Sequence, residues 1–217
     1  MKPSEWEVII LKPTPVFQAF IAAQCPDIDA PDLKTLQTDC TAYAIPKQAN
    51  DEETLNTIES HFKLMFHHEL SRWLGDEVEH EIKGSFLDFL CCFKFELHSQ
   101  VVLLEDDFSK GKQMFCVRPR SVLLKWMKSI AEEHSDLTAV LERVNVSHLA
   151  ENATVVVKNF IQPSEVKGFV RAYYPAIYEV EMSRMCDQVE QWPAINTYQD
   201  FARYFTIDIH TQLIHLH

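Results

Sequence analysis

The sequence predicts an α+β fold in which a mostly antiparallel sheet packs against long amphipathic helices. The stretch "FKFELH" (93–98) alternates apolar and polar residues, which is typical of a half-buried strand. Residues 51–74 instead repeat apolar side chains at helical spacing. Hydrophobic residues make up 47% of the 217 positions and glycine only four of them, so we expect a well-packed chain.

The first part of the chain predicts a strand, a helix, a loop and a second strand. Residues 5–11 include an apolar run typical of a strand. Thr14 then fits the cap of a helix, and Pro15 fits its first position because proline needs no backbone donor there. Residues 25–32 contain two prolines and three aspartates, which favour a loop, and residues 41–45 predict a short strand.

The longest predicted helix covers residues 51–74. Asn50 precedes it as a cap, Glu53 can return the cap hydrogen bond, and Gly75 stands where a left-handed terminator belongs. Seven apolar residues fall on one face at helical spacing, namely Leu55, Ile58, Phe62, Met65, Phe66, Leu70 and Trp73. Burial of this face against a core is sufficient to explain the helix.

The rest of the chain alternates between strand and helix patterns. The strand at 93–98 precedes an apolar stretch at 100–104, which we expect as its buried neighbour, and residues 113–117 predict the partner of a hairpin. The later predicted elements are helices at 120–134 and 136–146, a strand at 154–160, helices at 163–172 and 175–191, a helix within "NTYQDFARYF" (196–205), and a final strand in "TIDIHTQLIHLH" (206–217).

The organisation of the chain is that of one domain. We find no internal repeat and no low-complexity linker. We therefore expect a single α+β domain over residues 1–217, with a division into two lobes near 148–152 as the alternative.

Charge and the start of the chain narrow the function classes. The chain has 32 acidic and 20 basic residues and a net charge of −12, which repels polyphosphates and argues against nucleic acid binding. The apolar run between Glu7 and Pro13 is too short for a secretory signal, and no run approaches the ~18 apolar residues of a spanning helix. We expect a cytoplasmic protein that begins at Met1 and does not insert into a membrane.

The cysteine and glycine patterns give no catalytic or cofactor signature. The six cysteines have apolar neighbours and no C-x-x-C spacing, so we expect buried free thiols, at Cys25, Cys40, Cys91, Cys92, Cys116 and Cys186. The four glycines form neither a nucleotide-binding loop nor Gly-x-Ser-x-Gly, so we expect no cofactor. A Cys–His pair that forms only in the folded chain stays open.

The segment "HFKLMFHHELSRWLGDEVEH" (61–80) contains four of the ten histidines and raises the question of a metal site. His61 and His68 are separated by about 10.5 Å of helical rise, too far for one ion. Glu77 with His80 supplies only one of the two Glu-x-x-His pairs of a di-iron bundle. We expect a solvated helix end and no metal site here.

Two further features stay open in the sequence. Glu69 lies within the apolar stripe, where a buried carboxylate needs a basic partner or has a functional role; the alternative is a stripe less buried than its pattern suggests. His215 and His217 fall on one strand face, which fits a metal site if a third ligand joins them and otherwise fits an exposed strand end.

Charge is also segregated along the chain. Residues 51–81 carry nine acidic and two basic side chains, whereas residues 108–131 carry six basic and no acidic ones. These regions either steer a partner or neutralise each other within the fold. Large amphipathic side chains at 168–185 suggest a contact surface, with burial in the core as the alternative. Our candidate partner-binding residues are Tyr173, Tyr174, Tyr178, Met182, Met185, Phe115 and Trp126.

Two functions follow as hypotheses. The first is a non-catalytic adaptor or chaperone in a hetero-oligomer with a protein partner, and the second is an enzyme that uses scattered Cys, His and Glu residues, with or without a metal. The chain resembles the small acidic adaptor and chaperone subunits of bacterial secretion systems, especially those of type IV coupling complexes. The resemblance lies in its size, its acidity, its low glycine content and the alternating segment "FKFELH" beside long amphipathic helices. The resemblance carries no motif and assigns no functional residue; it implies delivery of effector proteins to a secretion channel without catalysis.

Overall fold

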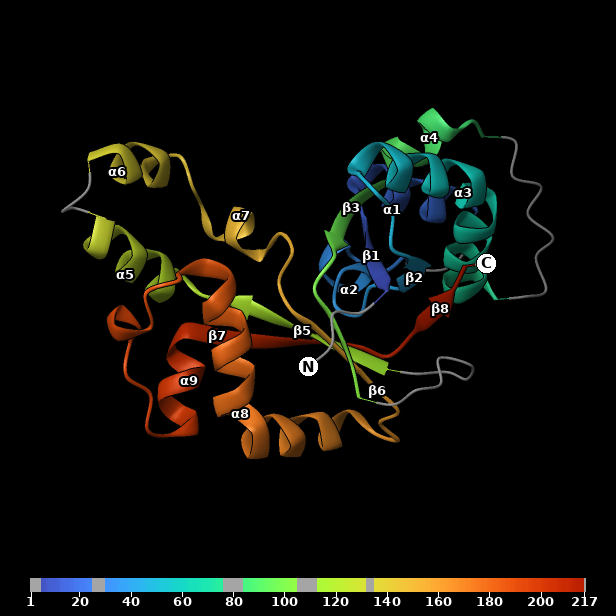
Figure 1. Ribbon diagram of the computed structural model, residues 1–217. Helices are drawn as coiled ribbons and strands as arrows, with labels where there is room; N and C mark the ends of the chain where they lie inside the picture. The colour runs from blue at the N-terminus through green and yellow to red at the C-terminus, as the bar shows by residue number, and fades with distance from the viewer. Residues whose placement is uncertain (1–4, 25–29, 76–83, 105–112, 132–134, 217) are drawn as a thin grey trace. The chain divides into compact units, whose positions relative to one another are not determined.

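The computed structural model describes residues 5–24, 30–75, 84–104, 113–131 and 135–216 and has an α+β fold (Figure 1). The chain forms two compact units. We call Glu5–Leu97 with Gln212–His217 the terminal unit and His98–Thr211 the inserted unit. Residues 148–152, where the sequence suggested a division, lie inside the inserted unit. The last residues of the chain therefore belong to the same unit as the first strand.

The terminal unit contains a four-stranded sheet in the order β3-β1-β2-β8. Its elements are β1 (Trp6–Pro13), α1 (Pro15–Gln24), α2 (Leu33–Leu36), β2 (Ala42–Pro46), α3 (Asp51–Leu74), α4 (Phe86–Cys92), β3 (Phe93–His98) and β8 (Leu213–His215). Strands β1 and β2 are antiparallel, with Ile9 opposite Tyr43. Strand β8 pairs in parallel with β2, so the C-terminus completes this sheet.

The sequence signals for α3 are confirmed, and α1 begins at Pro15 as predicted, although the Thr14 hydroxyl donates to the Cys91 carbonyl at 2.6 Å instead of capping the helix. The Asn50 side chain accepts a hydrogen bond from the Glu53 amide at 2.9 Å, and the helix ends at Gly75, whose φ of 84° suits a residue without a side chain. The predicted stripe of α3 is largely buried, with Leu55 as the exception at 43% exposure. Helix α4 was not predicted from the sequence, although Ser85 and Asp88 form a complete capping box there.

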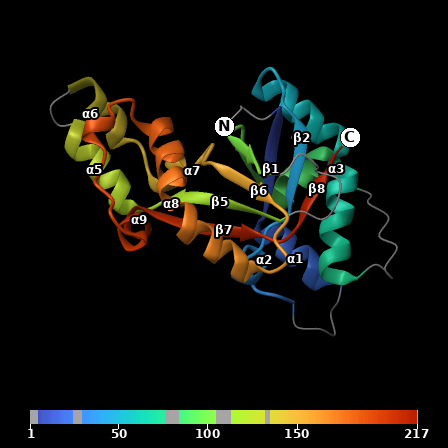
Figure 2. The same cartoon turned by 60° about the horizontal axis from the view of Figure 1, so that its bottom comes forward.

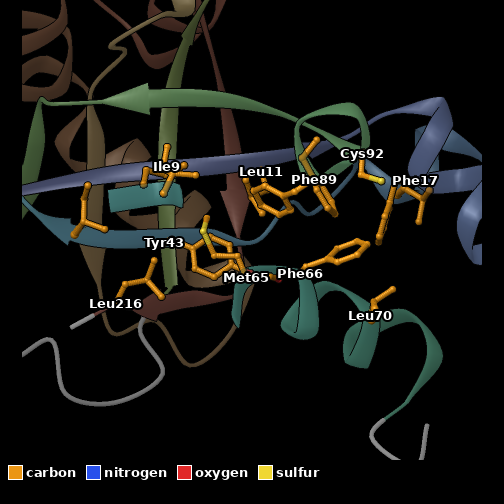
Figure 3. Close-up of a cluster of buried hydrophobic side chains, with 14 of the residues drawn as sticks. Ile9, Leu11, Phe17, Tyr43, Met65, Phe66, Leu70, Phe89, Cys92 and Leu216 are labelled. Carbon is orange, nitrogen blue, oxygen red and sulfur yellow. The ribbon is translucent and has the colours of Figure 1, made fainter. Parts of the chain in front are cut away.

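The core of the terminal unit joins segments from both ends of the chain. Figure 3 shows labelled side chains from β1, α1, β2, α3 and α4 converging on one cluster that also includes Leu216. Phe17 contacts Phe93 with a ring separation of 4.5 Å, and Leu216 is 2% exposed. The final residues are therefore part of this hydrophobic core.

The inserted unit contains a second four-stranded sheet in the order β4-β6-β5-β7. Its elements are β4 (Val101–Leu103), β5 (Gln113–Pro119), α5 (Ser121–Ala131), α6 (Ser135–Glu142), α7 (Val146–Ala150), β6 (Val155–Lys158), α8 (Pro163–Met185), the 3-10 helix η1 (Val189–Gln191), α9 (Tyr198–Tyr204) and β7 (Phe205–His210). Helices α8 and α9 pack against the sheet (Figure 2), where Val166, Val170 and Phe201 join the buried core.

The predicted strand pairings need correction. Both sheets are mixed, because β4 and β6 are parallel, as are β2 and β8, while the other pairs with a defined register are antiparallel. The expected hairpin of 100–104 with 113–117 does not form, since β6 lies between β4 and β5. The strand at 93–98 and its expected neighbour belong to different sheets. A side-chain pattern identifies a strand but carries no information on its neighbour.

Two predicted breaks are also placed differently. The helices expected at 163–172 and 175–191 are one helix, α8, with Pro175 inside it. Proline removes one helical hydrogen bond and kinks a helix that continues past it, and the ribbon of α8 changes direction partway along its length (Figure 1). The single strand expected at 206–217 is two strands, β7 and β8, one in each sheet.

No helix in the described part of the chain is long and apolar enough to cross a membrane.

Candidate functional site

A hollow of about 270 Å³ lies between helix α8 and the strands β4 and β6 of the inserted unit. We call it the apolar groove. It is lined by Val102, Leu104, Thr154, Val156, Lys158, Phe169, Tyr173, Ala176, Ile177 and Val180. Among these side chains only Lys158 carries a charge, so the surface that the groove presents is apolar.

The register of two parallel strands builds the floor of the apolar groove. Val102 on β4 lies opposite Val156 on β6, and alternate residues on each strand point to the same face. Leu104 and Thr154 extend this face at its two ends. Strand β4 is the last strand of the sheet as described, so the floor ends at a sheet edge.

Helical spacing builds the wall of the apolar groove. Phe169, Tyr173, Ala176, Ile177 and Val180 recur at intervals of three and four residues along α8, which places them on one face. The Phe169 and Tyr173 rings stack at 4.6 Å. Tyr173 is 55% exposed and Ala176 is also exposed, so this wall is accessible from outside.

A buried ion pair fixes α8 to the start of β6. Glu181 is fully buried and accepts hydrogen bonds from the Thr154 amide at 3.1 Å and the Thr154 hydroxyl at 2.6 Å. Arg184 donates to Glu181 Oε1 at 2.8 Å and to the Leu149 carbonyl at 2.8 Å. Since Thr154 also lines the apolar groove, this network holds the wall and the floor together.

The seven candidate residues from the sequence all lie in the inserted unit. Six belong to its core or pack against it: Phe115, Trp126, Tyr174, Tyr178, Met182 and Met185. The Tyr178 hydroxyl donates to the Pro193 carbonyl at 2.6 Å, and burial raises the pKa of Tyr178 to about 12. Tyr173 is the candidate that both lines the apolar groove and is mostly exposed.

The other groove residues were not candidates in the sequence. Val102, Val156 and Val180 belong to segments that are far apart along the chain and carry no motif. The pair Glu181 and Arg184 at i, i+3 spacing on a helix was the one available signal of the network behind the groove.

Glu69 in the terminal unit is the buried carboxylate that the sequence left unexplained. It is 1% exposed, and the Tyr43 hydroxyl donates to it at 3.3 Å. Burial raises the pKa of Glu69, while Thr41, Arg72 and Tyr43 act in the opposite direction. Arg72 itself donates to the Thr41 hydroxyl at 3.0 Å and forms an ion pair with Asp39 at 3.2 Å. The carboxyl therefore belongs to a buried polar network.

The thiols beside this network are not activated. Cys40 is buried, and desolvation raises the pKa of its thiol to about 12, so the thiolate that a nucleophile needs is scarce at neutral pH. Burial likewise raises the pKa of Cys92 to about 11. Among the described residues five cysteines are in no disulfide, with Cys116 buried, Cys186 half-buried and Cys91 exposed. Cys25 lies outside the described residues.

The histidine clusters do not converge within the described residues. His61 Nδ1 contacts the Thr57 carbonyl at 2.9 Å, and the His68 ring stacks on Tyr43 at 6.2 Å. His215 lies against Trp6 with a ring separation of 4.2 Å. No group of three or more His, Cys, Asp or Glu side chains there could hold a metal ion. Glu77, His80 and His217, which the sequence analysis weighed as possible metal ligands, lie outside the described residues.

The basic segment at 108–131 has two kinds of cations. Arg118 is 7% exposed and forms an ion pair with Asp208 at 2.9 Å, which is neutralisation within the unit. Arg120 and Lys125 are exposed. Lys110 and Lys112 lie outside the described residues.

Comparisons with protein-family models, curated proteins and solved structures find no match to this chain.

Proposed function

We propose that the protein is a non-catalytic adaptor or chaperone that binds an apolar segment of a partner protein in the apolar groove. The observation that carries the proposal is an accessible hollow lined by nine uncharged side chains and one lysine. Large apolar and aromatic groups that are exposed together are typical of surfaces that recognise proteins.

The lining of the groove suits apolar side chains of a protein partner. The groove has about 270 Å³ and its helix wall is accessible from outside, so it suits a few apolar side chains on one face of a helix or strand. The raised thiol pKa values of Cys40 and Cys92 lend no support to the alternative of a cysteine enzyme.

Delivery of effector proteins to a secretion channel, which the resemblance implies, is the specific form of this proposal. In that form the partner is an exported protein or a component of the export machinery, and the complex assembles in the cytoplasm. The net charge of −12 favours partners with basic surfaces during association.

The test is partner capture with a matched pair of helix variants. Ala176→Glu places a carboxylate in the apolar groove, whereas Ala172→Glu places the same group at an exposed position of α8 that does not line it. Each tagged protein is used to isolate partners from the native lysate in about 0.5 M salt, where exposed charge contacts are largely screened. Mass spectrometry then gives the stoichiometry.

We expect a near-stoichiometric partner with the wild type and Ala172→Glu, and its loss with Ala176→Glu. Equal melting temperatures of the two variants would show that both are folded. Equal capture by both variants would reject the groove as the binding surface. A wild-type protein that elutes alone and monomeric would reject the adaptor function and redirect attention to enzyme assays.

A further inference from the structure

A second hollow of the inserted unit, of about 180 Å³, is bordered by positive charge. We call it the basic pocket. Its polar rim is formed by Arg120, Lys167, Arg171, Tyr198 and Thr206. Apolar residues of α8, α9 and β7 form the rest of the lining. The pocket lies beside α8, as the apolar groove does, but is lined by different residues of this helix.

Two segments bring the cations together, namely α8 and the residue before α5. Lys167 and Arg171 are four residues apart on α8 and therefore lie on one face. The Arg120 amide donates to the Tyr204 carbonyl at 2.7 Å, which fixes the start of α5 to the end of α9. The Arg171 guanidinium lies over the Tyr198 ring at 5.5 Å from its centre.

The cations of the basic pocket have no acidic counterpart there. No lining side chain is acidic, and within the described residues none of the three forms an ion pair. Arg118, two residues before Arg120, shows the contrast because Asp208 neutralises it at 2.9 Å. Like charges at i, i+4 spacing destabilise a helix, so Lys167 and Arg171 lower the stability of α8. Two cations side by side are notable in a chain with 32 acidic residues.

We infer that the basic pocket binds the carboxylate side chains of an acidic segment in the partner protein, and this inference rests on the proposed function. Two guanidinium groups can each hold a carboxylate through paired hydrogen bonds, and a hollow of about 180 Å³ leaves room for one or two such side chains. The partner then contributes apolar side chains to the groove and an acidic segment to the pocket.

The probe is a blocked hexapeptide of alternating Glu and Ala, compared with its Gln counterpart by calorimetric titration of the full chain. The protein as a whole repels an acidic peptide because its net charge is −12. A preference for the Glu peptide therefore requires a local positive site. We expect the wild type to bind the Glu peptide at least about tenfold more tightly than the Gln peptide at about 0.1 M salt.

A charge-matched pair of variants locates the site. The pocket variant carries Arg120→Gln, Lys167→Gln and Arg171→Gln. The control variant carries Lys63→Gln, Lys94→Gln and Lys125→Gln, which are exposed and outside the pocket. Both change the net charge from −12 to −15. We expect the pocket variant to lose the preference for the Glu peptide and the control variant to keep it.

Two results would overturn the inference. If both variants bind the Glu peptide equally more weakly than the wild type, the attraction comes from diffuse electrostatics. If inorganic phosphate displaces the Glu peptide at a concentration well below the dissociation constant of the peptide, the pocket is a phosphate site. Partner capture separates this inference from the proposed function. If the pocket variant still captures the partner and Ala176→Glu does not, the adaptor function stands while the acidic segment is rejected.

Discussion

The two units each bury a glutamate on a long helix, but they surround it differently. In the inserted unit Glu181 receives two hydrogen bonds from Thr154 and a direct ion pair from Arg184. In the terminal unit Glu69 receives a longer hydrogen bond from Tyr43, and the nearby Arg72 is directed to Thr41 and Asp39. The two carboxylates are therefore buried to nearly the same extent but have different partners, because the neighbouring arginine contacts Glu181 directly and is directed away from Glu69.

The units also differ in how their surfaces are shaped. Both hollows described above lie in the inserted unit, between its helices and its sheet. The terminal unit closes its core with aromatic contacts among Phe17, Phe66, Phe89 and Phe93.

The largest effect is expected from Arg184→Ala. This change leaves the buried Glu181 without its cation, which costs about 3–5 kcal/mol of unfolding free energy in buried ion pairs. Urea denaturation measures the loss. Addition of Glu181→Gln should restore part of the stability, because the neutral amide needs no cation. A loss below about 1 kcal/mol in Arg184→Ala would contradict the importance of this pair.

Leu216→Ala should have the next largest effect. Truncation of a buried leucine costs about 2–5 kcal/mol, and Leu216 is 2% exposed in the core of the terminal unit. Hydrogen exchange should then increase in β1, β2 and α3 and stay unchanged in the inserted unit. The control is Leu213→Ala, which alters a half-buried position in β8, just before Leu216. Increased exchange throughout both units would show that they unfold together.

Glu69→Gln should have a smaller effect that depends on pH. Because burial raises the folded-state pKa of Glu69, the folded protein binds its proton more tightly than the unfolded chain does. Wild-type stability should therefore fall as the pH rises from the unfolded pKa, near 4.5, through the folded pKa. The Gln side chain does not titrate, so the stability of the variant lacks this pH dependence. At acidic pH we expect the unfolding free energies of the two proteins to agree within about 1 kcal/mol. At higher pH we expect the wild type to become less stable relative to the variant.

Urea unfolding at a series of pH values tests this prediction. The matched control is Glu59→Gln, which changes an exposed carboxyl on the same helix. A stability difference between the wild type and Glu69→Gln that is constant with pH would mean that Glu69 is not the titrating group.

The last prediction concerns the reactivity of the cysteine thiols and needs no substitution. With a pKa of about 12, roughly one Cys40 thiol in ten thousand is ionised at pH 8. Iodoacetamide should therefore modify the exposed Cys91 long before Cys40 in the native protein, and the difference should vanish in urea. Mass spectrometry of the peptides gives the rates. Reaction of Cys40 as fast as Cys91 would revive the hypothesis of a cysteine enzyme.

Local patterns in the sequence determined the α+β class and most of the individual elements. The helix at 51–74 has its predicted bounds because Asn50 and Gly75 each act on the helix turn beside them and the apolar stripe repeats between them. The stripe placed Glu69 among apolar residues but left its burial open, and the structure shows that it is buried. These features depend on short-range backbone geometry, which the order of residues specifies directly.

Tertiary structure alone decided the strand neighbours, the two units and the candidate sites. The apolar groove needs β4 beside β6, more than fifty residues apart, and the basic pocket needs Arg120 to meet Lys167 and Arg171. The terminal unit likewise needs β8 from the end of the chain. Such pairings result from the packing of whole faces against each other, and alternation within one strand is compatible with many partners. For this reason the sequence identified Tyr173 but not the groove that surrounds it.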